Sequence, residues 1–427
     1  MSIDAATEKL ALLGGPKAIR SEYDDLFRWP IVTEEDEQAV LAVLRAGAMS
    51  GSEVTRQFET EYAAYQGSKH ALAFCNGTAA LLAAMYGCGV RRGDEIICPS
   101  LTYWASALPV FSLGGTVVFA DIEPDSICID PKDIEHRITP RTKAIVVVHY
   151  CGHPADMDPI MEIARRHKIR VIEDVSHAHG ALYKGRLVGS IGDVGAMSMM
   201  SGKSFPVGEA GMLCTNDQVI FERALALGHY ERTEAEITIP ELKPFVKLPL
   251  GGYKHRISQT CSAMGRVQLR HYPQRMEEIQ KAMNYFWDGL EGVPGLRAHR
   301  PAKGSGSTMG GWYNPLGHYV PEELGGLPID RFFQAANAEG AHGWRAANMA
   351  LHLHSVFNTA DIYGDGKPTR IAFSDRDLRQ GRGTLPVSEA LSDRCMGIPW
   401  FKKLDAKRID EWVDAYRKVA LQAEALK

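Results

Sequence analysis

The stretch KAIVVVHYCGHPADMDPIMEIARRHKIRVIEDV, residues 143–175, contains two apolar segments separated by a helix-like segment. The apolar segments, 143–150 and 170–175, are rich in β-branched residues and hydrophobic on both faces, which is typical of buried parallel strands. Between them, apolar residues recur at helical spacing on one side of the chain: Met157, Ile160, Met161 and Ala164. The stretch therefore predicts a strand–helix–strand unit with parallel strands.

The same alternation continues on both sides of this unit. Further candidate strands lie at 71–74, 95–100, 116–122, 195–200 and 211–216, and helical patterns lie between several of them. Repeated strand–helix–strand order predicts an α/β fold with a mostly parallel, doubly wound sheet, covered by helices on both faces.

The pattern changes after about residue 250. A long helical pattern, 263–293, is followed by a glycine-rich break at 301–312, and an amphipathic helix is predicted near the C-terminus. The stretch 363–384, rich in Gly, Arg and Asp, is predicted to be an exposed loop or insertion. We therefore expect three parts: an N-terminal segment (1–35), a large α/β domain (36–255) and a small α+β domain (256–427).

Composition excludes several classes of partner. The 427-residue chain has 45% hydrophobic residues, 23% charged residues and a formal net charge of -4, so neither nucleic acid nor an anionic membrane is a favoured partner. No apolar run approaches the roughly 20 residues that span a bilayer. The N-terminus does not resemble a signal peptide, and the eight cysteines form no Cys-x-x-Cys pair. These features predict reduced thiols and a cytoplasmic location.

The segment SMMSGKSFPVGEAGMLCTND, residues 198–217, contains one lysine, Lys203, between a glycine and a serine. A phosphate-binding P-loop would need a further glycine at position 197, where the chain has Met197. The Phe-Pro-Val-Gly sequence that follows also resists continuation as a helix. The P-loop hypothesis therefore fails.

A Schiff-base lysine fits the segment better. Asp174 ends a predicted strand upstream of Lys203, and the carboxyl ends of parallel strands meet at the edge where α/β proteins bind ligands. A buried carboxylate there could keep a pyridine nitrogen protonated, which lets the ring accept electrons. Upstream, CNGTAALL places Thr78 at the start of a helix, where free N–H groups form a site for a phosphate.

With these pieces in order, the chain resembles the DegT/DnrJ/EryC1/StrS family of pyridoxal-phosphate-dependent sugar aminotransferases. The matching landmarks run through nearly the whole chain: NGTAAL, GDEIICPSLTYWASA, DIEPDSICIDP, VIEDVSHAHGALYKGRLVGSIGDVGAMSM and GEAGMLCTND. The resemblance implies a type I aminotransferase fold, with a mostly parallel seven-stranded sheet in the large domain and a smaller α+β domain.

The resemblance also implies roles for individual residues. Lys203 would condense with the aldehyde of pyridoxal 5′-phosphate and then move protons, and Asp174 would pair with the pyridine nitrogen. His177 would lie beside the 3-oxygen of the ring, and Tyr103, rather than the adjacent Trp104, would stack on the ring face. The phosphate would be held by Gly77, Thr78, Ala79 and Ser198.

Two segments differ from the family or leave alternatives open. The family often has GYNYR, whose asparagine reaches a phosphate across a dimer interface, whereas this chain has GYKHR, so Lys254 is the candidate for that role. The GEAG turn containing Glu209 departs mildly from the family's GEGG.

Two histidine groups admit a second interpretation. At strand period, His149, Cys151 and His153 share one face and could form a zinc site, although the resemblance explains them as a strand end and a loop, and no metal is predicted. The pair His352 and His354 aligns with a segment near the family's substrate mouth, so either substrate contact or packing is possible.

The leading functional hypothesis is a ping-pong transaminase. Glutamate or glutamine would donate the amino group, and the acceptor would be a ketone of a nucleotide-linked sugar or of a cyclitol such as scyllo-inosose, in amino-sugar, glycan or natural-product biosynthesis. Alternatives are an aminobenzoate-type synthase, a sugar dehydratase (whose members carry histidine in place of the lysine) and a non-catalytic cofactor-binding regulator. The resemblance further implies a homodimer with shared active sites.

Overall fold

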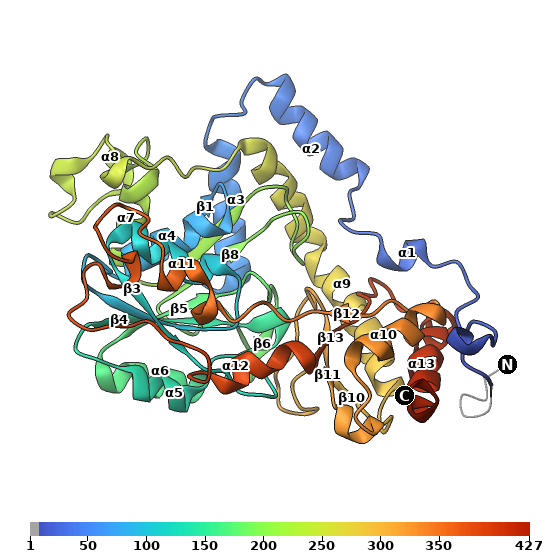
Figure 1. Ribbon diagram of the computed structural model, residues 1–427. Coiled ribbons are helices and arrows are strands. Elements are labelled where there is room, and N and C mark those ends of the chain that lie inside the picture. Colours follow the sequence, from blue (N-terminus) through green and yellow to red (C-terminus); the bar gives the residue numbers. More distant parts are fainter. Residues whose placement is uncertain (1–7) are drawn as a thin grey trace.

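The computed structural model describes residues 8–427, and a seven-stranded sheet lies at its centre (Figure 1). The strand order is β1-β9-β8-β5-β4-β2-β3. All neighbours are parallel except β9, which runs antiparallel to β1 and β8. The strands are β1 (His70–Phe74), β2 (Glu95–Pro99), β3 (Thr116–Ala120), β4 (Thr142–Val148), β5 (Arg170–Asp174), β8 (Val194–Ser198) and β9 (Gly211–Thr215).

All seven predicted strands and the mostly parallel sheet are confirmed. The strands are almost entirely buried, because helices cover both faces of the sheet. Figure 1 shows one pair of helices on one face and a second pair on the other. The pairs are α5 (Pro131–Arg137) with α6 (Met157–His167), and α4 (Gly77–Gly87) with α7 (Gln218–Gly228).

Two further helical layers extend this core. Helix α3 (Glu53–Gln66) packs on β1 and on the long helix α9 (Gln259–Gly289), which also packs against α2 (Glu34–Arg45). Four short elements lie outside these layers: α1 (Asp24–Phe27), β6 (Leu182–Tyr183), β7 (Arg186–Leu187) and α8 (Thr233–Glu236).

The C-terminal part forms a second, smaller sheet with helices on it. Its four strands are antiparallel in the order β10-β11-β13-β12. They are β10 (Leu296–Ala298), β11 (Leu316–Tyr319), β12 (Trp344–Arg345) and β13 (Cys395–Gly397), and the main helices are α10 (Ile329–Ala338) and α13 (Ala406–Leu421).

The apolar side chains form two separate cores. The larger one surrounds the seven-stranded sheet, and the smaller one joins the end of α9 to α10 and α13. The smaller core also contains Leu10 and Leu26 from the N-terminal segment, which therefore packs on the C-terminal part. The division at residues 35 and 255 stays a prediction, and α9 contributes side chains to both cores.

A strap, residues 346–391, leaves the small sheet after β12, crosses to the large sheet and returns to β13. It contains α11 (Ser355–Asn358) and α12 (Pro386–Ala390). The segment predicted as an exposed loop lies inside it and is mostly exposed, although Arg370 and Leu378 are buried.

The strap covers the edge of β3. The Arg370 Nε donates to the carbonyl of Val117 at 3.0 Å, and the Gln380 carboxamide bonds both the N–H and the carbonyl of Phe119 at 3.2 and 2.9 Å. These side chains satisfy backbone groups that an edge strand otherwise leaves unpaired. Among residues 8–427, no helix is both long and apolar enough to cross a membrane.

Candidate active site

A cavity of about 520 Å³ opens at the carboxyl ends of the parallel strands. This is the edge at which open α/β sheets bind ligands. Its wall combines residues of the large sheet with residues that follow β10 and β12. Polar and aromatic residues of this wall include Asn76, Gly77, Thr78, Tyr103, Asp174, Ser176, His177, Ser198, Lys203, Glu209, Tyr313, Asn314 and Asn348, with Gly77 at the start of α4.

The start of α4 forms one end of this cavity. Asn76 caps the helix by accepting the N–H of Ala79 at 2.9 Å, which leaves the N–H groups of Gly77 and Thr78 without an intrahelical acceptor. A Cβ on Gly77 would lie 2.6 Å from the Cβ of Ser198, so only glycine allows the helix to approach β8 this closely. The positive end of the helix and the Ser198 side chain suit an anion such as a phosphate.

Asp174 ends β5 and is 4% exposed. The hydroxyl of Ser106 donates to its Oδ2 at 2.7 Å, and the N–H of Ser176 donates to its Oδ1 at 3.0 Å. These two bonds fix the carboxylate on the wall of the cavity.

Lys203 lies in the turn between β8 and β9 and is 8% exposed. Its N–H donates to the carbonyl of Met200 at 2.8 Å, and its carbonyl accepts the indole N–H of Trp29 at 2.9 Å. The ammonium nitrogen lies 4.1 Å from the centre of the Tyr313 ring. Burial lowers the pKa of Lys203 to about 8, against the opposing effect of Asp174. Roughly a tenth of the amine is therefore neutral and nucleophilic at pH 7, far more than for a lysine with the ordinary pKa.

His177 also lines the cavity, with its Nδ1 accepting the N–H of Cys151 at 3.4 Å and its ring 4.9 Å from that of Tyr313. Burial, reinforced by Lys203, lowers the pKa of His177 well below its ordinary value, so the imidazole is neutral. His179 has a different place, because its Nε2 donates to the carbonyl of Ser198 at 2.8 Å behind the cavity wall.

The remaining predicted residues lie at or beyond the mouth. Tyr103 lines the cavity and is 49% exposed, whereas Trp104 lies in a neighbouring groove. The side chain of Ala79 also faces that groove, and its N–H is used by Asn76. Lys254 is exposed and does not line the cavity of its own chain.

The two histidine groups that admitted a second interpretation form hydrogen bonds within the chain. His149 bonds Glu173 at 3.0 Å and the N–H of Ala155 at 3.0 Å, and His153 bonds the carbonyl of Pro154 at 2.9 Å. Residues 8–427 contain no group of three or more His, Cys, Asp and Glu side chains that could hold a metal ion.

His352 is fully buried and bonds both Ser100 and Glu389, while His354 caps α11. Neither lines the cavity, so for this pair the packing alternative agrees with the structure.

Sequence patterns did not point to the four cavity-wall residues that the C-terminal part contributes: Tyr313, Asn314, Ala346 and Asn348. Only Tyr313 and Asn314 have a nearby sequence signal, the Gly310-Gly311 pair just before them. A Cβ on Gly311 would lie 2.4 Å from the Cβ of Ser204, so this loop approaches the lysine turn closely.

Comparison with known proteins identifies the family. The model of the DegT/DnrJ/EryC1/StrS aminotransferase family matches residues 30–359. The chain belongs to this family. It is a pyridoxal-phosphate-dependent aminotransferase with the type I fold, as its sequence predicted.

Similar proteins act on rings of two kinds. A putative L-glutamine:3-amino-2,3-dideoxy-scyllo-inosose aminotransferase from Micromonospora echinospora is 33% identical, over 99% of both chains. An L-glutamine:scyllo-inosose aminotransferase from Streptomyces griseus is 34% identical, over 96% of this chain and 97% of its own. The crystal structure of DesI with its TDP-sugar product has a TM-score of 0.78 at 26% identity, covering 98% of this chain and 97% of that one.

The cavity fits pyridoxal 5′-phosphate. It combines an anion site at a helix start, a fixed carboxylate and a buried amine, and Gly77 keeps the space that a side chain would fill. When bound, the cofactor supplies a ring that accepts the electrons of a carbanion.

Proposed function

We propose that this enzyme transfers the amino group of glutamine or glutamate to a ketone on the ring of a sugar or cyclitol. The observation that carries the proposal is the buried amine of Lys203, with a pKa of about 8, in one cavity with Asp174 and the start of α4. The printed activities of the similar proteins support the choice of donor and acceptor.

The predicted site residues then have the following roles. Lys203 carries the cofactor and moves a proton between carbon atoms in each half of the reaction. Asp174 holds the proton on the pyridine nitrogen, and neutral His177 lies beside the ring. Gly77, Thr78 and Ser198 bind the phosphate, with Ala79 behind them, and Tyr103 covers the ring face.

A homodimer is part of this proposal. Beside the cavity lies an apolar groove lined by three exposed aromatic or aliphatic side chains, Trp104, Ile362 and Tyr363, and the exposed Tyr103 lies at the mouth of the cavity. A second copy would cover these side chains and bring its Lys254 to the phosphate. All eight cysteines are free thiols, which supports a reducing, cytoplasmic location.

The test is to follow the two half-reactions separately. Glutamine or glutamate should bleach the visible absorption of the cofactor-loaded enzyme, and a ring ketone should restore it. If neither amino acid changes the spectrum of an enzyme that binds the cofactor, the proposed function is wrong.

A further inference from the structure

The cavity wall changes character away from the lysine. Among the described residues that line it, Lys203 is the only lysine or arginine, and the carboxylates are Asp174 and Glu209. The wall contributed by the C-terminal part contains two carboxamides, Asn314 and Asn348. A carboxamide can both donate to and accept from a hydroxyl group, and it carries no charge.

Asn348 is held in one orientation by Tyr150. The Tyr150 hydroxyl accepts the backbone N–H of Asn348 at 3.1 Å and donates its proton to the side-chain Oδ1 at 2.7 Å. Burial raises the pKa of Tyr150 well above its ordinary value, so the hydroxyl keeps this proton. Because the oxygen is committed to Tyr150, the amide NH2 is the group left for a ligand, and it has no acceptor among the described residues.

Asn314 complements this arrangement. Its Nδ2 points to the sulfur of Cys151 at 3.6 Å, which leaves its Oδ1 as an acceptor. One wall therefore carries a donor on Asn348 and an acceptor on Asn314, the pair that a hydroxyl-bearing ring can satisfy.

The strap fixes Asn348 relative to the sheet. Ala350, two residues after Asn348, pairs with Leu101, which is two residues beyond the end of β2. The Leu351 N–H donates to the carbonyl of Ser100 at 2.9 Å. The next residue, His352, bonds the Ser100 hydroxyl at 2.7 Å.

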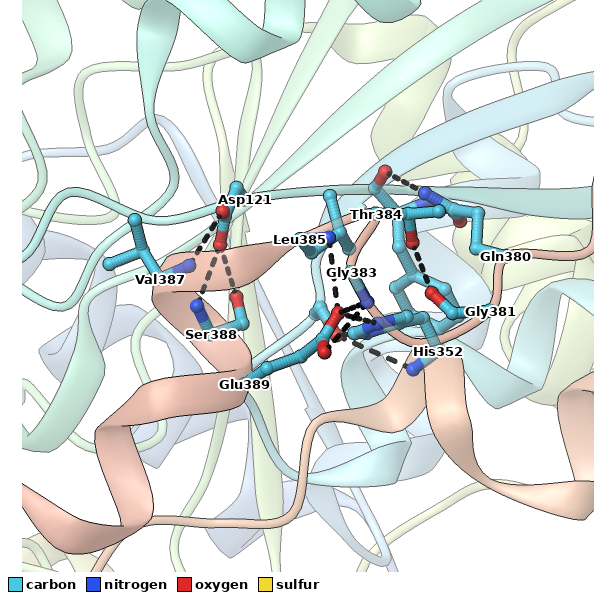
Figure 2. Close-up of polar contacts among 12 residues, drawn as sticks. Asp121, His352, Gln380, Gly381, Gly383, Thr384, Leu385, Val387, Ser388 and Glu389 are labelled. Atoms are coloured by element: carbon cyan, nitrogen blue, oxygen red, sulfur yellow. Dashed lines mark hydrogen bonds and ion pairs between the residues drawn. The ribbon is translucent and has the colours of Figure 1, made fainter.

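Figure 2 shows the contacts of His352 and of the C-terminal end of the strap. The other nitrogen of His352 lies 3.1 Å from Glu389, whose carboxylate also accepts the N–H groups of Gly383 and Leu385. Asp121, one residue beyond β3, accepts the N–H groups of Val387 and Ser388 at the start of α12. Both ends of the strap are thus bonded to the carboxyl edge of the large sheet.

We propose that the Asn348 amide NH2 donates a hydrogen bond to a hydroxyl oxygen on the ring of the acceptor. This inference rests on the proposed function and adds a residue that recognises the acceptor. Asn348 contributes to the choice of acceptor and takes no part in the proton transfers assigned to Lys203.

The experiment compares two probe ketones, scyllo-inosose and a TDP-linked keto-sugar, with the pyridoxamine form of wild-type and Asn348→Ala enzyme. The ketone with the higher kcat/KM on wild type is the parent ketone. Asn348→Ala should lower kcat/KM for the parent ketone about tenfold, the loss of one hydrogen bond at about 1.4 kcal/mol per factor of ten. Bleaching by the amino donor should slow by a smaller factor.

Monodeoxy analogues separate recognition from a structural defect. At least one analogue should react more slowly than the parent ketone with wild type, yet at the same rate as the parent with Asn348→Ala. Asn216→Ala is the matched control, because Asn216 is exposed beyond β9, at the opposite edge of the sheet.

A wild-type kcat/KM for the parent ketone in Asn348→Ala would overturn the inference while leaving the proposed function intact. The inference is also wrong if Asn348→Ala slows both half-reactions equally. It is wrong as well if every analogue that wild type uses more slowly than the parent ketone is also used more slowly by Asn348→Ala. If wild type bleaches with neither glutamine nor glutamate, the proposed function itself fails, and the inference fails with it.

Discussion

At the scale of single residues, the chemistry depends on how Asp174 and Lys203 are held. Ser106 and Ser176 orient the Asp174 carboxylate, and it faces the cavity from the end of a buried strand. A carboxylate in that place keeps a nearby pyridine nitrogen protonated, and an amide cannot do so.

We therefore expect Asp174→Asn to bind the cofactor but to lose about 10²-fold or more in kcat. The carboxamide retains the shape of the side chain and its bond from Ser106, so the fold should not change. Cofactor content by absorption and kcat by coupled assay would check this, with Asp193→Asn at the opposite edge of the sheet as a control for amide substitution. Normal turnover in Asp174→Asn would contradict the assigned role.

The pKa of Lys203 predicts how pH controls cofactor uptake. Because burial lowers this pKa from 10.5 to about 8, half of the amine is in the reactive neutral form at about pH 8 and nearly all of it about one unit higher. The rate at which cofactor-free enzyme gains visible absorption should rise with pH and level off above roughly pH 9. A rate that keeps rising about tenfold per pH unit up to pH 10 would indicate an ordinary lysine.

At the scale of elements, the lysine turn is held by a segment that lies far away in the sequence. Trp29 donates its indole N–H to the Lys203 carbonyl, and its ring lies 5.3 Å from that of Trp400. The N-terminal segment and the C-terminal part therefore meet at the turn that carries Lys203.

Trp29→Phe should remove this bond and keep most of the packing. We expect a two- to tenfold weaker affinity for the cofactor, since one hydrogen bond contributes about 0.5–1.5 kcal/mol. Trp400→Phe is the matched control, because the indole N–H of Trp400 is buried without a partner among the described residues. Equal effects of the two substitutions in a cofactor titration would contradict a specific role for the Trp29 bond.

Sequence patterns predicted the large sheet well, because its strands are five to seven residues long and apolar on both faces. They indicated Asp174 and Lys203 as candidate site residues, because a strand end and the turn between β8 and β9 can be recognised from the local sequence. They could not predict Asn348, whose position depends on Tyr150, 198 residues away in the chain. The small sheet was predicted only as a mixed α+β region, since its strands have two to four residues and carry little pattern.

At the scale of the whole molecule, the proposed dimer makes a prediction about mixing. Lys203→Ala and Lys254→Ala should each be impaired, but a mixed dimer contains one site with both lysines intact. Mixing the two variants under conditions that exchange subunits should therefore restore activity above that of either variant alone. No recovery, although sedimentation shows mixed dimers, would place Lys254 outside the partner's site.

The two apolar cores and the strap bring segments from the whole chain to one cavity. The proposed function depends on Lys203 carrying the cofactor in that cavity. Lys402 is the natural rival, because it is also buried and its pKa is lowered to about 6 by burial. Cofactor-loaded enzyme would be reduced with borohydride, digested and examined by mass spectrometry. The account predicts that the added pyridoxyl mass lies on the peptide containing Lys203, and a mass on Lys402 or on no lysine would contradict it.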